Sequence, residues 1–175
     1  MNNAHIPILG FAAPSGTGKT TLLTQLIPQL REQKIRVGLI KHSHHNFQID
    51  KPGKDSFRLR EAGATPVMLV SSHRRAIITE FATQQEPVLD EQLEFFDQSS
   101  LDLILVEGFK RERFAKIELH RPSLGLPLLY PDDSCIIAIA SDQAITLERE
   151  IVSMDLNNIP QIAGFILHTF LNHHD

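Results

Sequence analysis

A glycine-rich segment near the amino terminus constrains the fold of this chain more than any other feature. Residues 13–20 read Ala-Pro-Ser-Gly-Thr-Gly-Lys-Thr, which matches the phosphate-binding pattern Gly-x-x-x-x-Gly-Lys-Ser/Thr except that Ala13 replaces the first glycine. A continuous apolar run over 6–13 precedes the segment, and an amphipathic pattern over 19–33 follows it. Because an unbroken apolar run is typical of a strand buried on both faces, the pattern predicts a strand, a loop and a helix in succession.

The residue types of this loop suit a nucleoside triphosphate. Gly16 and Gly18 let backbone N–H groups approach phosphate oxygens, Lys19 brings an ammonium to the β- and γ-phosphates, and Thr20 offers a hydroxyl to Mg²⁺. The positive end of the following helix points at the same phosphates. Motif and context together favour binding of Mg²⁺ and a nucleotide over a glycine-rich turn that binds nothing. The predicted nucleotide-binding residues of the loop are Ser15, Gly16, Thr17, Gly18, Lys19, Thr20 and Thr21.

Two acidic residues are candidates for the metal side of this site. Glu107 ends the apolar run 103–106, and P-loop proteins place an acid at the end of a neighbouring buried strand to hold Mg²⁺ or its waters. Asp50 lies in the polar loop 42–54, which follows a second predicted strand over 35–41, and it could hold a Mg²⁺-bound water. We therefore predict catalytic roles for Glu107 and Asp50, and metal binding by these two acids with Thr20.

Asp142 is the candidate for recognition of the base. It follows a predicted strand over 135–140, where a carboxylate could accept hydrogen bonds from N1–H and N2–H₂ of guanine. GTPases commonly reach this position through Asn-Lys-x-Asp, whereas the residues before Asp142 are Ala140 and Ser141. An aspartate that only caps a turn or a helix is an equally good interpretation.

Two further polar segments admit a functional and a plain interpretation. His42, His44 and His45 suggest a metal site, but no cysteine is nearby, and we favour solvated histidines over structural zinc. A basic run, Lys110 to Arg113, follows the Glu107 strand and could close over phosphates, although a solvated charge run is slightly favoured.

Alternating strand and helix patterns predict an α/β fold of the P-loop NTPase type, with a mostly parallel sheet flanked by helices. The length of 175 residues indicates a single domain over 1–175. Segments 66–81 and 115–121 are predicted to form ribbon-like antiparallel insertions, the first as a hairpin. The alternating pattern of 115–121 is typical of a half-exposed strand, which we expect to contribute to a dimer interface because exposed strand edges pair readily.

Composition limits the partners and the compartment. The 17 basic and 21 acidic residues give a formal charge of −4, so no overall basic field indicates nucleic-acid binding. No apolar run is long enough for a membrane span, and the amino terminus lacks the features of a signal peptide. Cys135 is the single cysteine, which fits a reducing compartment. We expect a cytoplasmic protein.

Several stretches taken together resemble the family of molybdopterin-guanine dinucleotide biosynthesis adapter proteins, MobB. The most specific are Asp-Lys-Pro-Gly-Lys-Asp-Ser at 50–56 and Val-Glu-Gly-Phe-Lys at 106–110, and the remaining stretches are 15–23, 38–42 and 59–64. The resemblance implies a GTP-binding protein with weak GTPase activity that forms homodimers through extended strands. It also implies an assisting role for the molybdenum cofactor guanylyltransferase, which attaches GMP to molybdopterin, and molybdopterin itself is a possible ligand. In this family the loop entrance is not strictly glycine, so Ala13 is compatible with it.

Two functions follow from these features. The first is an accessory GTPase with GTP and Mg²⁺ as ligands, whose hydrolysis is slow because the sequence offers no convincing catalytic glutamine or arginine finger. The second is an ATP-dependent small-molecule kinase of the P-loop class, in which the run Lys110 to Arg113 serves as a lid. Asp142 alone carries the preference for guanine.

Overall fold

The computed structural model describes residues 1–43 and 47–173. These residues group into two compact units, one made of Met1–His42 with the chain from Val88 onward, the other of Ser43–Pro87. The single domain expected from length stays a prediction. None of the helices in the described ranges combines the length and apolarity that a membrane crossing requires.

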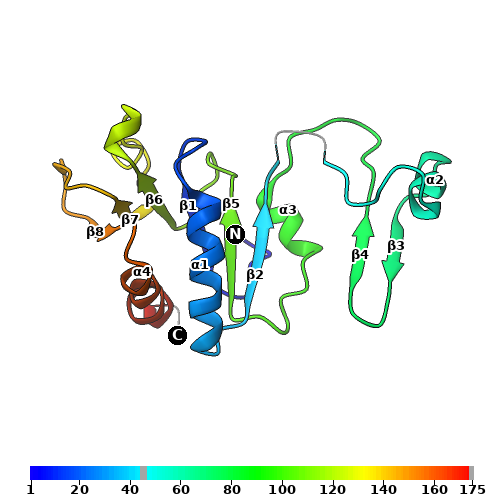
Figure 1. The fold of residues 1–175 in the computed structure, drawn as a ribbon, viewed down its shortest axis with the longest axis horizontal. Helices are drawn as coiled ribbons and strands as arrows, with labels where there is room; N and C mark the ends of the chain where they lie inside the picture. The colour runs from blue at the N-terminus through cyan, green and yellow to red at the C-terminus, as the bar shows by residue number, and fades with distance from the viewer. Residues whose placement is uncertain (44–46, 174–175) are drawn as a thin grey trace. The chain divides into compact units, whose positions relative to one another are not determined.

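The first unit is built on a six-stranded sheet in the order β2-β5-β1-β6-β7-β8, with every neighbouring pair parallel (Figure 1). The strands are β1 (Ile8–Ala12), β2 (Val37–Lys41), β5 (Leu103–Glu107), β6 (Lys116–His120), β7 (Ile136–Ser141) and β8 (Val152–Asp155). The predicted α/β class with a parallel sheet is confirmed. Strand β8 was not expected, because Met154 is its only buried residue and its short sequence carries no clear apolar pattern.

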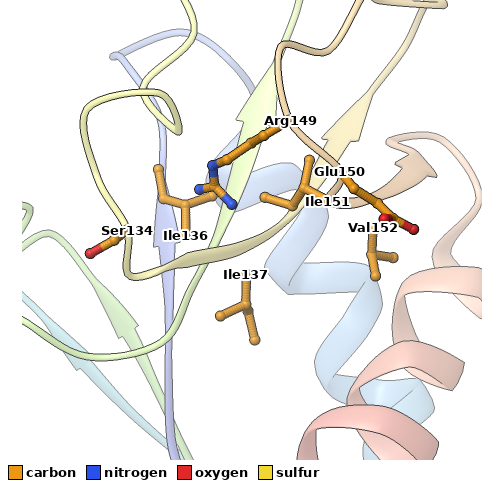
Figure 2. A pocket seen from close by; sticks show the side chains of 7 residues that line it. All are labelled: Ser134, Ile136, Ile137, Arg149, Glu150, Ile151 and Val152. Atoms are coloured by element: carbon orange, nitrogen blue, oxygen red, sulfur yellow. The ribbon is translucent and has the colours of Figure 1, made fainter.

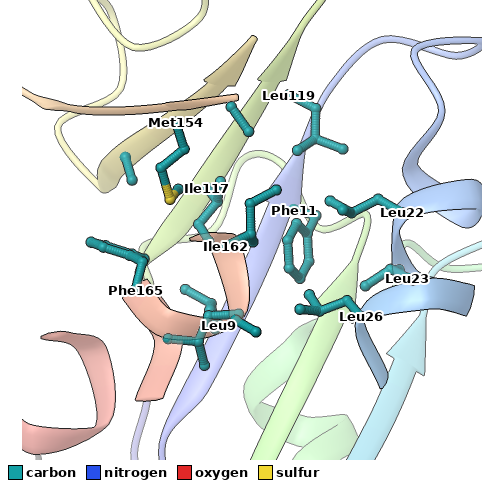
Figure 3. Close-up of a cluster of buried hydrophobic side chains, with 14 of the residues drawn as sticks. Leu9, Phe11, Leu22, Leu23, Leu26, Ile117, Leu119, Met154, Ile162 and Phe165 are labelled. Atoms are coloured by element: carbon teal, nitrogen blue, oxygen red, sulfur yellow. The ribbon is translucent and has the colours of Figure 1, made fainter. Parts of the chain in front are cut away.

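Helices cover both faces of this sheet. They are α1 (Lys19–Glu32), α3 (Leu89–Glu94) and α4 (Ile159–Phe165), which continues through a π-helical turn over Ile166–Phe170 and a short 3₁₀ turn over Leu171–His173. A second 3₁₀ turn spans Pro122–Leu124. Leu9 and Phe11 of β1 pack with residues of α1 and α4 on one face (Figure 3), whereas Ile8 packs with Leu89 and Leu93 of α3 on the other. The apolar run that forms β1 is therefore buried on both sides, as its sequence predicts.

The ends of the helices follow local chemistry. Gly18, with φ 103°, precedes the first residue of α1, and the helix continues past Pro28 to Glu32. At α4 the Asn158 side chain accepts a 3.1 Å hydrogen bond from the Gln161 N–H. The Gln161 side-chain oxygen in turn accepts from the Asp155 N–H at 2.9 Å. Asn158 therefore caps the first turn of α4.

Strand β6 contradicts the expectation for 115–121. It lies inside the parallel sheet between β1 and β7, and all five of its residues are buried. Its polar side chains are satisfied by neighbouring backbone and side chains. Lys116 Nζ lies 3.0 Å from Asp133, and the Glu118 carboxylate accepts 2.8 Å hydrogen bonds from the N–H groups of Leu129 and Tyr130. Burial raises the pKa of Glu118, and the two N–H donors oppose that rise. The prediction of an antiparallel ribbon and dimer edge at 115–121 was wrong.

The second unit contains α2 (Asp55–Glu61) and an antiparallel hairpin of β3 (Val67–Val70) and β4 (Arg75–Ile78). The hairpin predicted within 66–81 is confirmed. Several large apolar side chains of this unit are more than half exposed: Phe47, Ile49, Leu59, Met68, Val70, Ile77 and Phe81. Arg60 connects two segments of this unit through ion pairs, since its guanidinium lies 3.2 Å from Asp50 and 2.6 Å from Glu80.

An ion pair between Arg36 and Asp102, directly before β2 and β5, predicts that the stability of the folded state depends on pH. Arg36 donates to both oxygens of Asp102, at 2.6 Å from NH2 and 2.9 Å from Nε. These side-chain hydrogen bonds, with one from the Arg36 backbone N–H, lower the pKa of Asp102 to about 2. A depressed carboxyl pKa stabilises the fold above the unfolded pKa of about 4, and this contribution is lost as the pH falls through about 2.

We therefore expect Asp102→Asn to lower the melting temperature at pH 7, by an amount that shrinks steadily between about pH 4 and pH 2. Thermal unfolding followed by circular dichroism between pH 2 and pH 7 measures this difference. Asp132→Asn, which removes an exposed carboxylate in the same unit, is the matched control. A difference between wild type and Asp102→Asn that does not vary with pH contradicts the assignment.

Candidate nucleotide-binding site

The glycine-rich segment joins β1 to α1, and β1 lies between β5 and β6 in the sheet. Gly16 and Gly18 have φ angles of 82° and 103°, so both occupy the left-handed region that favours glycine. Positive φ angles among the described non-glycine residues occur only at Lys34 and Phe109. Ala13 therefore needs no left-handed conformation, which explains how alanine replaces the first glycine of the pattern.

Two side chains of the loop bind carbonyl groups of the loop itself. Lys19 Nζ donates to the carbonyl oxygens of Ala13 and Pro14 at 2.9 and 3.1 Å, and Thr17 Oγ1 donates to Pro14 at 2.9 Å. An ammonium has three donors. Two hold Lys19 over the loop, and one remains for an anion.

The electrostatic surroundings of Lys19 favour a polyanion. Burial lowers the pKa of Lys19, and the charges of Lys110 and Lys41 lower it further, whereas Glu107 opposes the shift. Lys41 Nζ lies 3.2 Å from the Glu107 carboxylate. The repulsion that Lys110 and Lys41 exert on Lys19 is opposed by Glu107, and phosphate groups would relieve it further.

Glu107 lies where the sequence placed it, at the carboxyl end of β5. The register pairs it with Phe11 of β1 on one side and with Lys41 of β2 on the other. The next two residues, Gly108 and Phe109, have φ angles of 97° and 50°. A Cβ on Gly108 would lie 2.6 Å from the Cβ of His42, so this turn requires glycine.

The oxygen donors at this edge of the sheet fit Mg²⁺. Thr20 is exposed in the first turn of α1, and Glu107 ends the strand beside β1. A hydroxyl and a carboxylate are hard oxygen ligands of the kind Mg²⁺ prefers when it also binds phosphates. Thr21 is exposed next to Thr20, at the same end of the helix.

Asp142 is linked to the loop through an arginine that the sequence analysis missed. Arg121 NH1 donates to Asp142 Oδ2 at 2.6 Å, and Arg121 Nε donates to the carbonyl oxygen of Thr17 at 2.9 Å. Arg121 directly follows β6, and Asp142 directly follows β7. No sequence motif marks Arg121. Its position becomes apparent only from the strand order, in which β6 lies between β1 and β7. The sequence pattern predicts an exposed ribbon for 115–121 instead.

Asp50 lies in the second unit, where its carboxylate is buried and its oxygens accept hydrogen bonds from Arg60 at 3.2 and 3.4 Å. Its assignment to the metal side of the site stays a prediction. His44 and His45 lie outside the described residues. Across residues 1–43 and 47–173, the structure shows no group of three or more histidine, cysteine or acidic side chains arranged to hold a metal.

A groove in the first unit lies away from this edge of the sheet. It is formed at the amino-terminal ends of β7 and β8 and in the chain before each strand (Figure 2). Its lining residues are Ser134, Ile136, Ile137, Arg149, Glu150, Ile151 and Val152. Arg149 is engaged with Tyr130, since it donates to the Tyr130 carbonyl at 3.1 Å and lies over its ring. The glycine-rich loop and Asp142 lie at the opposite, carboxyl ends of the strands.

Comparison with known proteins places this geometry in a family. The family profile described as "Molybdopterin guanine dinucleotide synthesis protein B", MobB, matches residues 8–142. The chain belongs to the MobB family. This match runs from the first residue of β1 to Asp142, the candidate for base recognition, and it includes the loop, Glu107 and Arg121. The resemblance inferred from the sequence is confirmed.

Relatives and solved structures agree with this membership. The molybdopterin-guanine dinucleotide biosynthesis adapter protein of Haemophilus influenzae is 49% identical over 174 residues, covering 97% of this chain and 94% of the relative. The protein of the same description from Escherichia coli is 48% identical over 163 residues, covering 93% and 92%. The crystal structure of Bacillus subtilis MobB gives a TM-score of 0.72 at 21% identity, over 93% of this chain and 96% of that chain. At this identity the structural match supports the fold alone.

Proposed function

We propose that this chain is a GTP-binding adapter protein of molybdopterin-guanine dinucleotide biosynthesis that hydrolyses GTP slowly. Membership of the MobB family supports the adapter role in this pathway. The observation that supports the choice of nucleotide is the position of Asp142 at the carboxyl end of β7, where Arg121 links it to the phosphate-binding loop. Ligands of parallel α/β sheets bind at this edge.

Each part of the nucleotide has a proposed partner. The backbone N–H groups around Gly16 and Gly18 and the ammonium of Lys19 bind the phosphates. Thr20 and Glu107 hold Mg²⁺, which offsets phosphate charge when it is bound. The Asp142 carboxylate accepts from the N–H donors of guanine. Asp50 keeps its proposed place on the metal side on the strength of the family resemblance.

Hydrolysis by the isolated protein is expected to be slow. The sequence offers no convincing glutamine to orient water, and Arg121 is engaged by Asp142 and the Thr17 carbonyl. GTPases without an activating partner turn over at roughly 10⁻⁴ to 10⁻² s⁻¹. A partner protein would then recognise the GTP-bound form of the adapter rather than depend on the rate of hydrolysis.

An adapter acts through partner proteins. The proposed partner is the molybdenum cofactor guanylyltransferase, with molybdopterin as a further candidate ligand. A homodimer is proposed through the β3–β4 hairpin, because a two-stranded ribbon has unpaired edges and this one exposes Met68, Val70 and Ile77.

Replacement of Asp142 by asparagine tests the proposed base recognition. Asp142→Asn is expected to weaken GTP binding by on the order of 100-fold, because an amide presents one acceptor and one donor to two guanine donors. Xanthosine triphosphate carries a carbonyl where guanine carries its amino group, so the variant is expected to bind it more tightly than wild type does. Loss of stability cannot produce such a gain.

Titration with fluorescent GTP in the presence of Mg²⁺, with competition by ATP and xanthosine triphosphate, measures these affinities. Asp132→Asn is the matched control and is expected to behave as wild type. Equal affinity of the wild type for GTP and ATP contradicts guanine recognition. A preference for ATP with ADP release stimulated by a small acceptor supports the kinase instead.

A further inference from the structure

We propose that Arg121 is a positioning residue for guanine recognition, which acts by fixing the carboxylate of Asp142 to the phosphate-binding loop. This inference rests on the proposed function, since it assumes that Asp142 reads the base. It adds a residue from a different strand to the nucleotide site. It also explains how a chain without the Asn-Lys residues common before such an aspartate can position it.

The topology places Arg121 between the two parts that it joins. Strand β6 is hydrogen-bonded to β1 on one side and to β7 on the other. The loop follows β1 and Asp142 follows β7, so a residue at the end of β6 lies between them. Arg121 occupies that position.

The guanidinium geometry suits this bridge. Nε donates to the Thr17 carbonyl oxygen at 2.9 Å while NH1 donates to Asp142 Oδ2 at 2.6 Å. Because a guanidinium is planar and its donors are fixed relative to one another, two such bonds also fix the positions of the two acceptors. A Cβ on Gly18 would lie 3.6 Å from Arg121 NH2, so the guanidinium also lies against the loop where α1 begins.

The residues directly before Asp142 do not supply an equivalent link. Ala140 is fully buried in the core, and the Ser141 hydroxyl accepts from the Gln143 N–H at 3.4 Å. The lysine of Asn-Lys-x-Asp precedes the aspartate by two residues, and Ala140 occupies that position here. In this chain the positive charge beside Asp142 comes from Arg121.

The pairing leaves acceptor capacity on Asp142. The side chains of Arg121 and Asp142 are 31% and 16% exposed, so the pair is partly shielded from water. Within the described residues Asp142 Oδ1 is buried and has no hydrogen-bond partner, whereas Oδ2 accepts from Arg121. Each carboxylate oxygen accepts up to two hydrogen bonds. Arg121 therefore orients the carboxylate while acceptor capacity remains on it for the N–H donors of guanine.

Comparison of three ligands separates this role from a structural one. GTP, ATP and inorganic tripolyphosphate are titrated into wild type, Arg121→Gln, Asp142→Asn and the double variant. Arg121→Gln is expected to weaken GTP binding about 10- to 100-fold, the range expected for loss of a charge-assisted hydrogen bond. Tripolyphosphate, which has no base, is expected to bind within about twofold of wild type. Because Arg121 acts through Asp142, the double variant should bind GTP no more weakly than Asp142→Asn alone.

Arg36→Gln is the matched control, since it breaks another arginine–aspartate pair at the opposite ends of the strands. It is expected to leave both affinities unchanged. If Arg121→Gln does not fold, Arg121→Lys replaces it, because a single ammonium cannot reproduce both donors of the fork and is expected to show the same selective loss.

Each other result overturns the inference. Equal losses for GTP and tripolyphosphate mean that Arg121 serves only the phosphate loop, and unchanged GTP binding means that it serves neither. Additive losses in the double variant mean that it does not act through Asp142. Failure of the proposed function appears separately, as a wild type that does not distinguish GTP from ATP, and the inference then falls with it.

Discussion

Lys19→Ala is expected to weaken the binding of GTP and of tripolyphosphate by at least about 100-fold. The substitution removes the ammonium that faces the phosphates, and with it the hydrogen bonds to the carbonyl oxygens of Ala13 and Pro14 that hold the loop. A charge-assisted hydrogen bond contributes about 1.5–3 kcal/mol, so the loss of the one donor left for the phosphates gives roughly 10- to 100-fold. The loss of the two hydrogen bonds that hold the loop adds to this factor.

The folded state without ligand is not expected to suffer in the same way. Burial and the neighbouring Lys110 lower the pKa of Lys19, so its charge is not stabilised by its surroundings in the free protein. The melting temperature of the free variant should therefore lie close to that of wild type. The increase in melting temperature on adding GTP should disappear, because only a ligand that binds the folded state stabilises it.

Isothermal titration and thermal shift assays with and without Mg²⁺ measure the two effects. Arg31→Ala, which removes an exposed cation from the other end of α1, is the control and should bind as wild type does. If Lys19→Ala binds GTP with wild-type affinity, the loop over 13–20 is not the nucleotide site.

The loop and its flanking elements could be predicted because their signals are local. An unbroken apolar run, a glycine-rich turn and an amphipathic pattern follow one another within about thirty residues, and each has its own physical signature. Glu107 could be predicted for a related reason. The carboxyl ends of parallel strands meet at one edge, so a polar residue directly after a buried run belongs to that edge.

The alternating pattern of β6 misled the prediction because it reports which side chains are polar, not whether they are exposed. Lys116 and Glu118 are buried. Besides the Glu112 carbonyl, which accepts from Lys116, their partners are Asp133 and the backbone of 129–130, more than ten residues further along the chain. Nothing near these residues in sequence indicates that they are satisfied. An edge position for β6 would not bring Arg121 between the loop and Asp142, so the pattern of 115–121 alone does not indicate this residue.

Asp50 and Asp142 differ in what the structure adds to them. Asp142 follows a strand of the same sheet as the loop and shares Arg121 with it. Asp50 belongs to a separate compact unit and shares Arg60 with Glu80. The prediction for Asp142 therefore gains a structural link to the candidate nucleotide site.

Ile117→Asp is expected to prevent folding, rather than to separate subunits as an edge position would predict. Ile117 is completely buried in β6 and packs in the core cluster that includes Leu9 and Phe11. An unpaired carboxylate there costs several kcal/mol after desolvation, and the lost packing of isoleucine adds about 2–5 kcal/mol. The sum is comparable with the whole stability of a typical domain, about 5–15 kcal/mol.

Ile77→Asp is the matched substitution in β4, where the side chain is 53% exposed. It is expected to leave the melting temperature nearly unchanged and, if the β3–β4 hairpin forms the proposed homodimer, to shift the protein to monomers. Circular dichroism and light scattering after gel filtration distinguish the two variants. A folded, monomeric Ile117→Asp protein would contradict the central position of β6. A charge in a buried strand disrupts the fold itself, whereas a charge on an exposed strand disrupts only contact with another subunit. Comparison of the two variants therefore distinguishes a core position from a position in a subunit interface.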